Sequence, residues 1–140
     1  MTKIRWRFDS DGPIDVIDPL GAVYIDGLEG ASIGDGCTNI DVFFFALIAL
    51  VRELRVTDEA RIDLVIEPAP LVGSLQTDGS LRLQYGAQTV TVESVDDLEH
   101  ELRIAVRAFL AAMPADAPFG EDPLAVLQRF VGGMRSDPDA

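Results

Sequence analysis

Carboxylates are the side chains in this chain most able to do chemistry. The 140 residues include 24 acidic and 11 basic side chains, for a net charge of −13. Every charged residue between Phe8 and Val51 is acidic, and this acidic segment consists of Asp9, Asp11, Asp15, Asp18, Asp26, Glu29, Asp35 and Asp41. Charge runs usually form solvated surface, but several of these carboxylates stand beside Gly or Pro in predicted loops, where binding groups are often presented. We predict that the first seven bind a basic partner.

The single histidine and the single cysteine do not form a catalytic pattern. His100 is flanked by Glu99 and Glu101 on the polar side of a predicted helix, which is typical of a solvated histidine. Cys37 precedes another predicted helix, whose N-terminus could lower the pKa of the thiol. Neighbouring carboxylates would oppose that shift, so we interpret Cys37 as a small packing residue. The sequence therefore predicts a protein that is not an enzyme.

Two stretches resemble ligand-binding loops but depart from the required patterns. Residues 9–15 carry closely spaced aspartates as a calcium loop does, but Gly12 comes too early and Pro13 follows it, so we interpret them as a turn. Residues 30–38 precede a helix as a phosphate loop does. They lack the lysine, and Asp35 would repel phosphate. We predict no metal site and no cofactor.

Composition narrows the remaining classes. A net charge of −13 disfavours nucleic acid and anionic membranes as partners, because both are negatively charged. One cysteine excludes an intramolecular disulfide. The longest apolar run, residues 42–51, is far shorter than the roughly 20 residues that cross a bilayer, and residues 1–7 lack the apolar core of a signal peptide. These features predict a cytoplasmic protein.

Alternating apolar and polar residues predict the strands. Residues 3–8 alternate clearly, residues 14–17 form a possible short strand, and residues 21–33 form an extended piece that leads into a loop at 34–36. The later strands are expected over residues 61–66, 71–75, 81–85 and 90–92. Asp78-Gly79 lies between two of these runs and is the strongest hairpin signal in the chain.

Two long helices and one short helix are predicted. The first, over residues 40–55, is preceded by Thr38 and contains Asp41, a spacing that resembles a capping box. Its residues Phe43 to Phe45 point in three directions, so either the helix is enclosed in the core or one phenylalanine lies exposed at an interface. The second helix, residues 95–113, is amphipathic and begins with a similar box at Ser94 and Asp97, and the third ends near Val131.

The order of these elements predicts the α+β class, with an antiparallel or mixed sheet of about six to seven strands packed with two main helices and a short C-terminal helix. We expect one domain over residues 1–131 and a flexible tail over residues 132–140.

The chain resembles the small acidic immunity proteins of bacterial polymorphic toxin systems in size, charge and element order. The features that carry this resemblance are a first strand with Trp6, the acidic region through Gly34-Asp35-Gly36, the apolar helix Asp41–Leu54, the Asp78-Gly79 meander and the helix from Ser94. The resemblance implies stoichiometric binding of a cognate toxin domain, expected to be basic, with occlusion of its active site or restriction of its motions.

Three alternatives remain open at this stage. The protein could be a homo-oligomeric structural or assembly protein, such as a homodimer built on the first helix or on a sheet edge. It could be a small-ligand-binding domain without catalysis, or a mimic of DNA that occupies a nucleic-acid-binding protein. The last shares its electrostatics with an acidic inhibitor and differs only in the partner.

Overall fold

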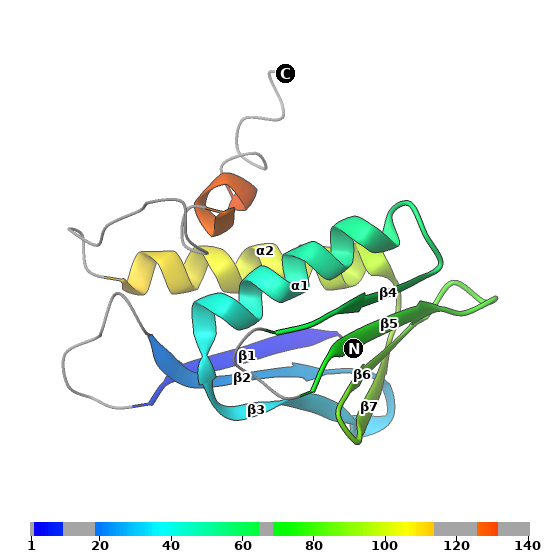
Figure 1. The fold of residues 1–140 in the computed structure, drawn as a ribbon, viewed down its shortest axis with the longest axis horizontal. Helices are drawn as coiled ribbons and strands as arrows, with labels where there is room; N and C mark the ends of the chain where they lie inside the picture. Colours follow the sequence, from blue (N-terminus) through cyan, green and yellow to red (C-terminus); the bar gives the residue numbers. More distant parts are fainter. Residues whose placement is uncertain (1, 10–18, 65–68, 114–125, 132–140) are drawn as a thin grey trace.

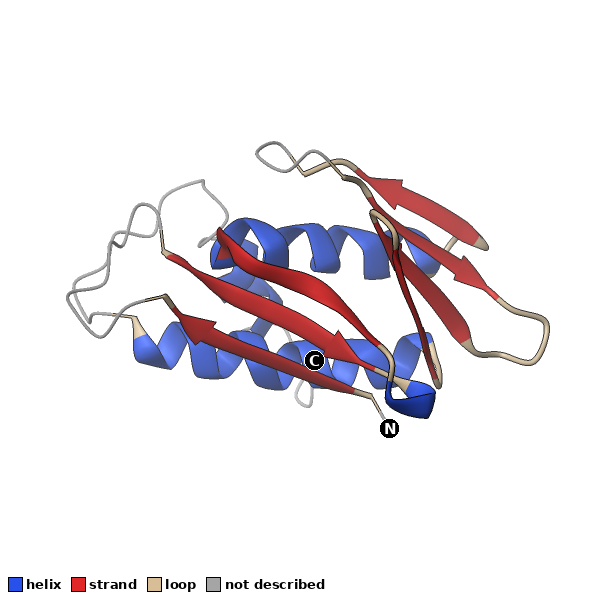
Figure 2. Cartoon of the chain, turned by 90° about the horizontal axis from the view of Figure 1, so that it is seen from below, coloured by secondary structure: helices blue, strands red, loops and turns tan. Residues whose placement is uncertain are grey.

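Two antiparallel sheets and two long helices make up most of the structure. The computed structural model describes residues 2–9, 19–64, 69–113 and 126–131. Seven strands in these ranges divide into sheets of three and four strands. Helices α1 (Ile40–Leu54) and α2 (Val95–Ala112) lie side by side on one face of both sheets, as Figures 1 and 2 show. The α+β class with antiparallel pairing is confirmed, whereas the expectation of one continuous sheet is wrong.

The first sheet has the order β1-β2-β3. Its strands are β1 (Lys3–Phe8), β2 (Leu20–Asp26) and β3 (Ser32–Asn39), with the 3-10 turn η1 (Leu28–Gly30) between the last two. The loop predicted at 34–36 is wrong, because these residues belong to β3 and Gly34 faces Tyr24 of β2. A Cβ atom on Gly34 would lie 2.2 Å from the Val23 carbonyl oxygen, so glycine here permits close strand approach within the sheet.

The second sheet follows chain order, β4-β5-β6-β7. Its strands are β4 (Glu59–Ile62), β5 (Leu71–Leu75), β6 (Leu81–Tyr85) and β7 (Gln88–Val92). The predicted hairpin at Asp78-Gly79 is confirmed, with the Gln76 amide bonded to the Ser80 carbonyl at 2.8 Å. The strand predicted over 61–66 is displaced: β4 begins and ends earlier, and Leu64 is buried outside it.

The sheets meet where β3 lies beside β7 without a shared ladder. The Gly34 amide donates to the Gln88 side-chain oxygen at 2.7 Å, so a side chain spans the gap that a backbone ladder would otherwise close. The chain leaves β3 directly into α1 and then pairs β4 with β5. This connection separates the two sheets. The alternation of apolar and polar residues predicts single strands but does not predict how the strands are grouped into sheets.

Helix α1 is enclosed over most of its surface, because it contacts both sheets and α2. Phe43 and Phe44 are fully buried, while Phe45 remains 40% exposed, so the helix is a core element that also presents one aromatic ring. The predicted capping box at Thr38 is wrong. Thr38 is still in β3, buried and paired with Gly21, and the N-cap residue is Asn39, which makes no side-chain cap bond.

Helix α2 is amphipathic as predicted, and its buried residues follow the expected stripe. Ser94 caps it by accepting a hydrogen bond from the Asp97 amide at 3.0 Å, which confirms the predicted cap. Phe109 is fully buried among the rings of Trp6, Phe8 and Phe44, at centroid separations of 5.5–5.9 Å. This aromatic cluster fastens α2 to both β1 and α1.

Residues 126–131 form a short helical segment that lies against α2 in Figure 1, where it is coloured orange. Its side chains Leu127 and Phe130 are buried, as the predicted third helix requires. The possible strand at 14–17, the start of that helix and the tail 132–140 lie outside the described residues. Within the described ranges, no helix combines the length and the apolar character needed to cross a membrane.

Candidate functional site

The described members of the acidic segment are distributed over several elements. Asp9 follows β1 and is exposed, and Glu29 is exposed in η1 with a left-handed backbone (φ 61°). Asp26 ends β2 and Asp35 lies within β3. The other three predicted binding residues, Asp11, Asp15 and Asp18, lie outside the described ranges. The sequence run therefore corresponds to carboxylates placed at strand ends, on a turn and inside a sheet.

Three of these carboxylates already make internal contacts. Asp26 accepts two hydrogen bonds from Arg5, at 2.6 and 2.9 Å, and this bond raises the pKa of the Arg5 guanidinium above its usual value. Asp35 accepts a hydrogen bond from the Tyr85 hydroxyl at 2.9 Å and so connects the two sheets. Asp41 is buried and accepts from the Val42 amide. Asp9 and Glu29 are the described members that present exposed carboxylates.

A second set of charged residues converges on one cleft of about 350 Å³. We call it the arginine cleft, and its lining consists of Val51, Arg52, Arg55, Glu99, Arg103, Arg129 and Phe130. These residues come from the end of α1, from α2 and from the 126–131 helix. Four of the chain's 11 basic residues therefore surround one hollow in a protein of net charge −13.

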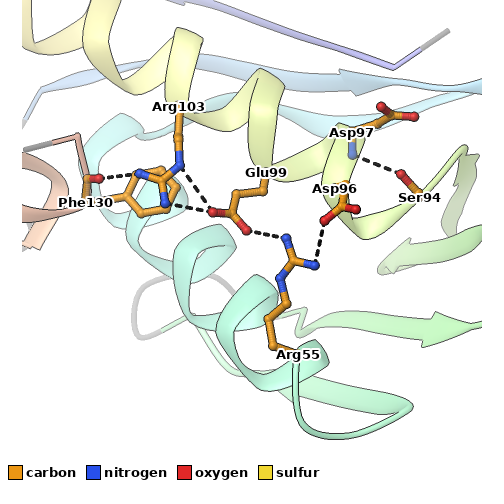
Figure 3. A network of polar contacts seen from close by, with 7 residues as sticks. All are labelled: Arg55, Ser94, Asp96, Asp97, Glu99, Arg103 and Phe130. Carbon is orange, nitrogen blue, oxygen red and sulfur yellow. Dashed lines mark hydrogen bonds and ion pairs between the residues drawn. The ribbon is translucent and has the colours of Figure 1, made fainter. Parts of the chain in front are cut away.

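Glu99 connects two of the cleft's arginines, as Figure 3 shows. Its carboxylate oxygens accept from Arg55 Nη2 at 2.5 Å and from Arg103 Nη2 at 2.7 Å. Arg55 also pairs with Asp96 at 2.7 Å. Burial of Glu99 by itself would raise its carboxyl pKa, but the hydrogen bonds and charges of the two arginines outweigh burial and lower that pKa. Glu99 is thus an ionised carboxylate that bridges the end of α1 and α2.

Arg103 joins the 126–131 helix to the same network. Its guanidinium lies 4.1 Å from the centre of the Phe130 ring and donates a hydrogen bond to the Phe130 carbonyl (Figure 3). The stacked ring and the carbonyl together hold the guanidinium in one orientation. Glu99 and Arg103 are four positions apart on α2, so their ion pair supports the helix and also positions one wall of the cleft.

Arg52 and Arg129 complete the cleft in a different way. Both are exposed, and neither makes a hydrogen bond or an ion pair among the described residues. A guanidinium carries five N–H donors in a planar fork that fits carboxylate and phosphate oxygens. The cleft therefore combines two internally bonded cations with two whose donors face no internal acceptor in the described part of the chain. Such an arrangement can bind an anion.

An apolar groove of about 340 Å³ adjoins this cleft across α1 and shares Arg52 with it. Its lining is Phe45, Ile48, Ala49, Arg52, Glu53, Val56, Ile62 and Val126. Phe45 is 40% exposed and Val56, in the turn after α1, is 81% exposed. Exposed apolar side chains gathered on one surface are typical of protein contact sites. The groove therefore pairs an exposed aromatic ring with a charged border.

His100 and Cys37 are the other residues that the sequence offered as candidates for chemistry. His100 is exposed on α2, as predicted, and the side chain of Cys37 lies outside the description. Within the described ranges, no three side chains of His, Cys, Asp or Glu are placed to hold a metal ion.

Sequence reasoning missed the arginine cleft because its arginines lie up to 77 positions apart, from Arg52 to Arg129. The local signals were the i,i+3 spacing of Arg52 and Arg55 and the i,i+4 spacing of Glu99 and Arg103. Neither signal indicates that the two helices place these residues around a common hollow.

Comparisons of the chain with protein-family models, with curated proteins and with solved structures found no match.

Proposed function

We propose that the protein acts by binding another protein stoichiometrically, as an inhibitor of the immunity-protein kind, and that its partner is a basic toxin domain met in the cytoplasm. The observation that carries this proposal is the charge excess. Even if every basic residue paired with one carboxylate, 13 carboxylates would have no basic residue left to pair with. A basic protein surface is the natural complement of that excess.

The apolar groove supports a protein as the partner. Interfaces concentrate their binding energy in a few buried aromatic and apolar anchors surrounded by polar residues. Phe45 and Val56 are exposed side chains of this kind, and Glu53 borders the same groove. In this proposal the carboxylates accelerate the encounter by long-range attraction, and the groove supplies the desolvated centre of the complex.

The first test identifies the partner and measures inhibition. The tagged protein is used to capture partners from its native cells at low salt, and mass spectrometry identifies them before and after a high-salt wash. The candidate is then purified and assayed with increasing amounts of this protein. We expect a basic protein whose activity falls to a minimum at a one-to-one ratio. A partner that keeps its full activity in the saturated complex would contradict the inhibitor role.

The second test asks whether the acidic segment steers association. A variant with Asp9, Asp11, Asp15 and Asp18 changed to Asn spares Asp26 and Asp35, which bond to Arg5 and Tyr85. The matched control removes four exposed charges elsewhere, by Asp58→Asn, Glu59→Gln, Asp63→Asn and Glu93→Gln. We expect the first variant to associate about tenfold more slowly at low salt, with a flatter salt dependence, because electrostatic steering acts mainly on the association rate.

The control variant has the same net charge and should show a smaller loss if the segment itself faces the partner. Equal slowing in both variants would mean that the acidic segment acts only through its contribution to the net charge of the protein. Unchanged rates in both, across all salt concentrations, would contradict charge-steered binding altogether.

A further inference from the structure

The geometry of the arginine cleft points to a second binding site, and we propose that it binds a small molecule through a phosphate or carboxylate group. This inference does not depend on the proposed protein partner. Two cations of the cleft, Arg52 and Arg129, have donors without an internal acceptor among the described residues, and they are the groups that would hold the oxyanion.

The internal contacts separate the four arginines into two roles. Arg55 bonds to Glu99 and Asp96, and Arg103 bonds to Glu99 and to the Phe130 carbonyl. Five of the six guanidinium nitrogens of these two residues make internal bonds, and the two residues form one wall of the cleft. Arg52 and Arg129 contribute their guanidiniums without such commitments and are the recognition residues. A site whose walls are held in place loses less conformational entropy when a ligand binds.

The balance of charge inside the cleft also favours an anion. Its lining carries four guanidiniums and one carboxylate, and Glu99 and the adjacent Asp96 are already matched by Arg55 and Arg103. The molecule as a whole repels anions, but charges more than about 8 Å away are largely screened at physiological ionic strength. Glu53, the neighbour of Arg52, lines the adjoining groove and not the cleft, so the lining of the cleft itself remains net positive.

The size of the cleft indicates a small ligand. A volume of about 350 Å³ lies at the lower end of the range for small-molecule sites, which is roughly 300–1,000 Å³. Val51 and Phe130 also line the cleft, but they are only 2% and 6% exposed, so the apolar surface that they offer a ligand is small. A compact oxyanion fits this combination better than an extended polymer does.

The test is an NMR titration of the full chain with inorganic phosphate, pyrophosphate and citrate, each against sodium chloride at matched ionic strength. Backbone amides and arginine Nε–H signals report the location, and calorimetry gives the affinity. We expect saturable shifts at Arg52, Arg129 and Phe130. Arg52→Gln and Arg129→Gln should each weaken binding about tenfold, since each removes charge-assisted hydrogen bonds.

Arg82→Gln is the matched control, because Arg82 is an exposed arginine on β6, away from the cleft. It should change the affinity by less than about twofold, as expected for a distant, solvent-screened charge. Tighter binding of pyrophosphate than of citrate would identify a phosphate ligand, and the reverse order would identify a carboxylate ligand. Melting curves of all three variants verify that they are folded.

Two results would overturn the proposal. One is the absence of saturable shifts in the wild-type protein at oxyanion concentrations up to about 10 mM. A dissociation constant above that concentration is weaker than most specific recognition. The other is an equal loss of affinity in the Arg82→Gln control, because binding would then follow total charge and not the cleft. Neither result bears on the protein partner, whose association is measured in a separate experiment.

Discussion

The acidic segment and the arginine cleft are two charged regions of this molecule, and they are built in opposite ways. The described carboxylates of the segment lie after β1 and on β2, η1, β3 and α1, and three of them bond to three different residues, Arg5, Tyr85 and Val42. The arginines of the cleft come from two long helices and a short one, yet two of them share Glu99 and all four line one hollow.

This difference separates two ways in which charge can act. Dispersed surface carboxylates create a field that acts over a distance and is reduced by salt, so they suit the encounter with a large partner. Convergent guanidiniums around a confined volume act at hydrogen-bonding range, so they suit a ligand that enters the cleft. The comparison therefore predicts that the two regions differ in salt dependence and in the kind of ligand they bind.

The largest expected effect comes from Phe109, whose ring packs between elements that carry the two regions. Its ring packs on Trp6 and Phe8 of β1, which leads to Asp9, and on Phe44 of α1, which leads to the cleft. Phe109→Ala should lower the free energy of unfolding by about 3–5 kcal/mol, because a large aromatic ring leaves a cavity. Urea denaturation measures this loss. A cost below about 1 kcal/mol would mean that the two regions are not supported by a common core.

An intermediate effect is expected at Glu99, which holds the cleft together. Glu99→Gln should lower the free energy of unfolding at pH 7 by about 1–3 kcal/mol, because hydrogen bonds to charged groups are among the stronger ones. The lowered pKa of Glu99 fixes the pH dependence: its stabilisation is complete above the unfolded-state value near 4.5 and is lost as pH falls through the folded value.

The difference between wild type and Glu99→Gln should therefore be constant from about pH 8 to pH 5 and narrow on further acidification. Urea denaturation of both proteins at each pH isolates this residue from the other carboxylates. Asp63→Gln, which changes an exposed carboxylate paired with Arg61 at the surface, is the control and should cost less than about 1 kcal/mol. A difference in unfolding free energy that grew below pH 5 would contradict the assignment of Glu99 as an ionised carboxylate that bridges the two arginines.

The smallest effect on the free energy of unfolding is expected for the two cleft arginines that have no internal partner among the described residues. Arg52→Gln and Arg129→Gln should each change the free energy of unfolding by less than about 0.5 kcal/mol, since neither arginine has an internal partner among the described residues. Chemical denaturation measures this directly. A loss above about 1 kcal/mol in either variant would show that the arginine stabilises the fold, and the contrast with Arg55 and Arg103 would then disappear.

Local patterns were sufficient for much of the fold. The alternation in β1, the turn at Asp78-Gly79 and the Ser94 cap were each predicted from neighbouring residues, and the structure has all three. These features depend on interactions within a few positions of the chain, so their signals are local. Leu81, Leu83 and Tyr85 likewise face inward as their spacing requires.

The errors arose where a tertiary contact outweighed the local signal. Thr38 and Asp41 have capping-box spacing, but Thr38 is held in β3 by its pairing with β2, so the helix begins at a residue without a side-chain cap. Gly34-Asp35-Gly36 has loop composition, but the absence of a Cβ atom on Gly34 allows β3 to approach β2. In both places the partner strand decided the conformation.

Composition and short-range spacing by themselves established the α+β class, the acidic character and the amphipathic face of α2, because those properties are sums or periods along the chain. The division into two sheets, the exposure of the Phe45 ring and the meeting of four arginines around one cleft were decided only by the tertiary structure. Residues far apart in the sequence become neighbours when the apolar faces of their helices are buried. Other residues form those apolar faces, so no local pattern around the charged residues predicts that they meet.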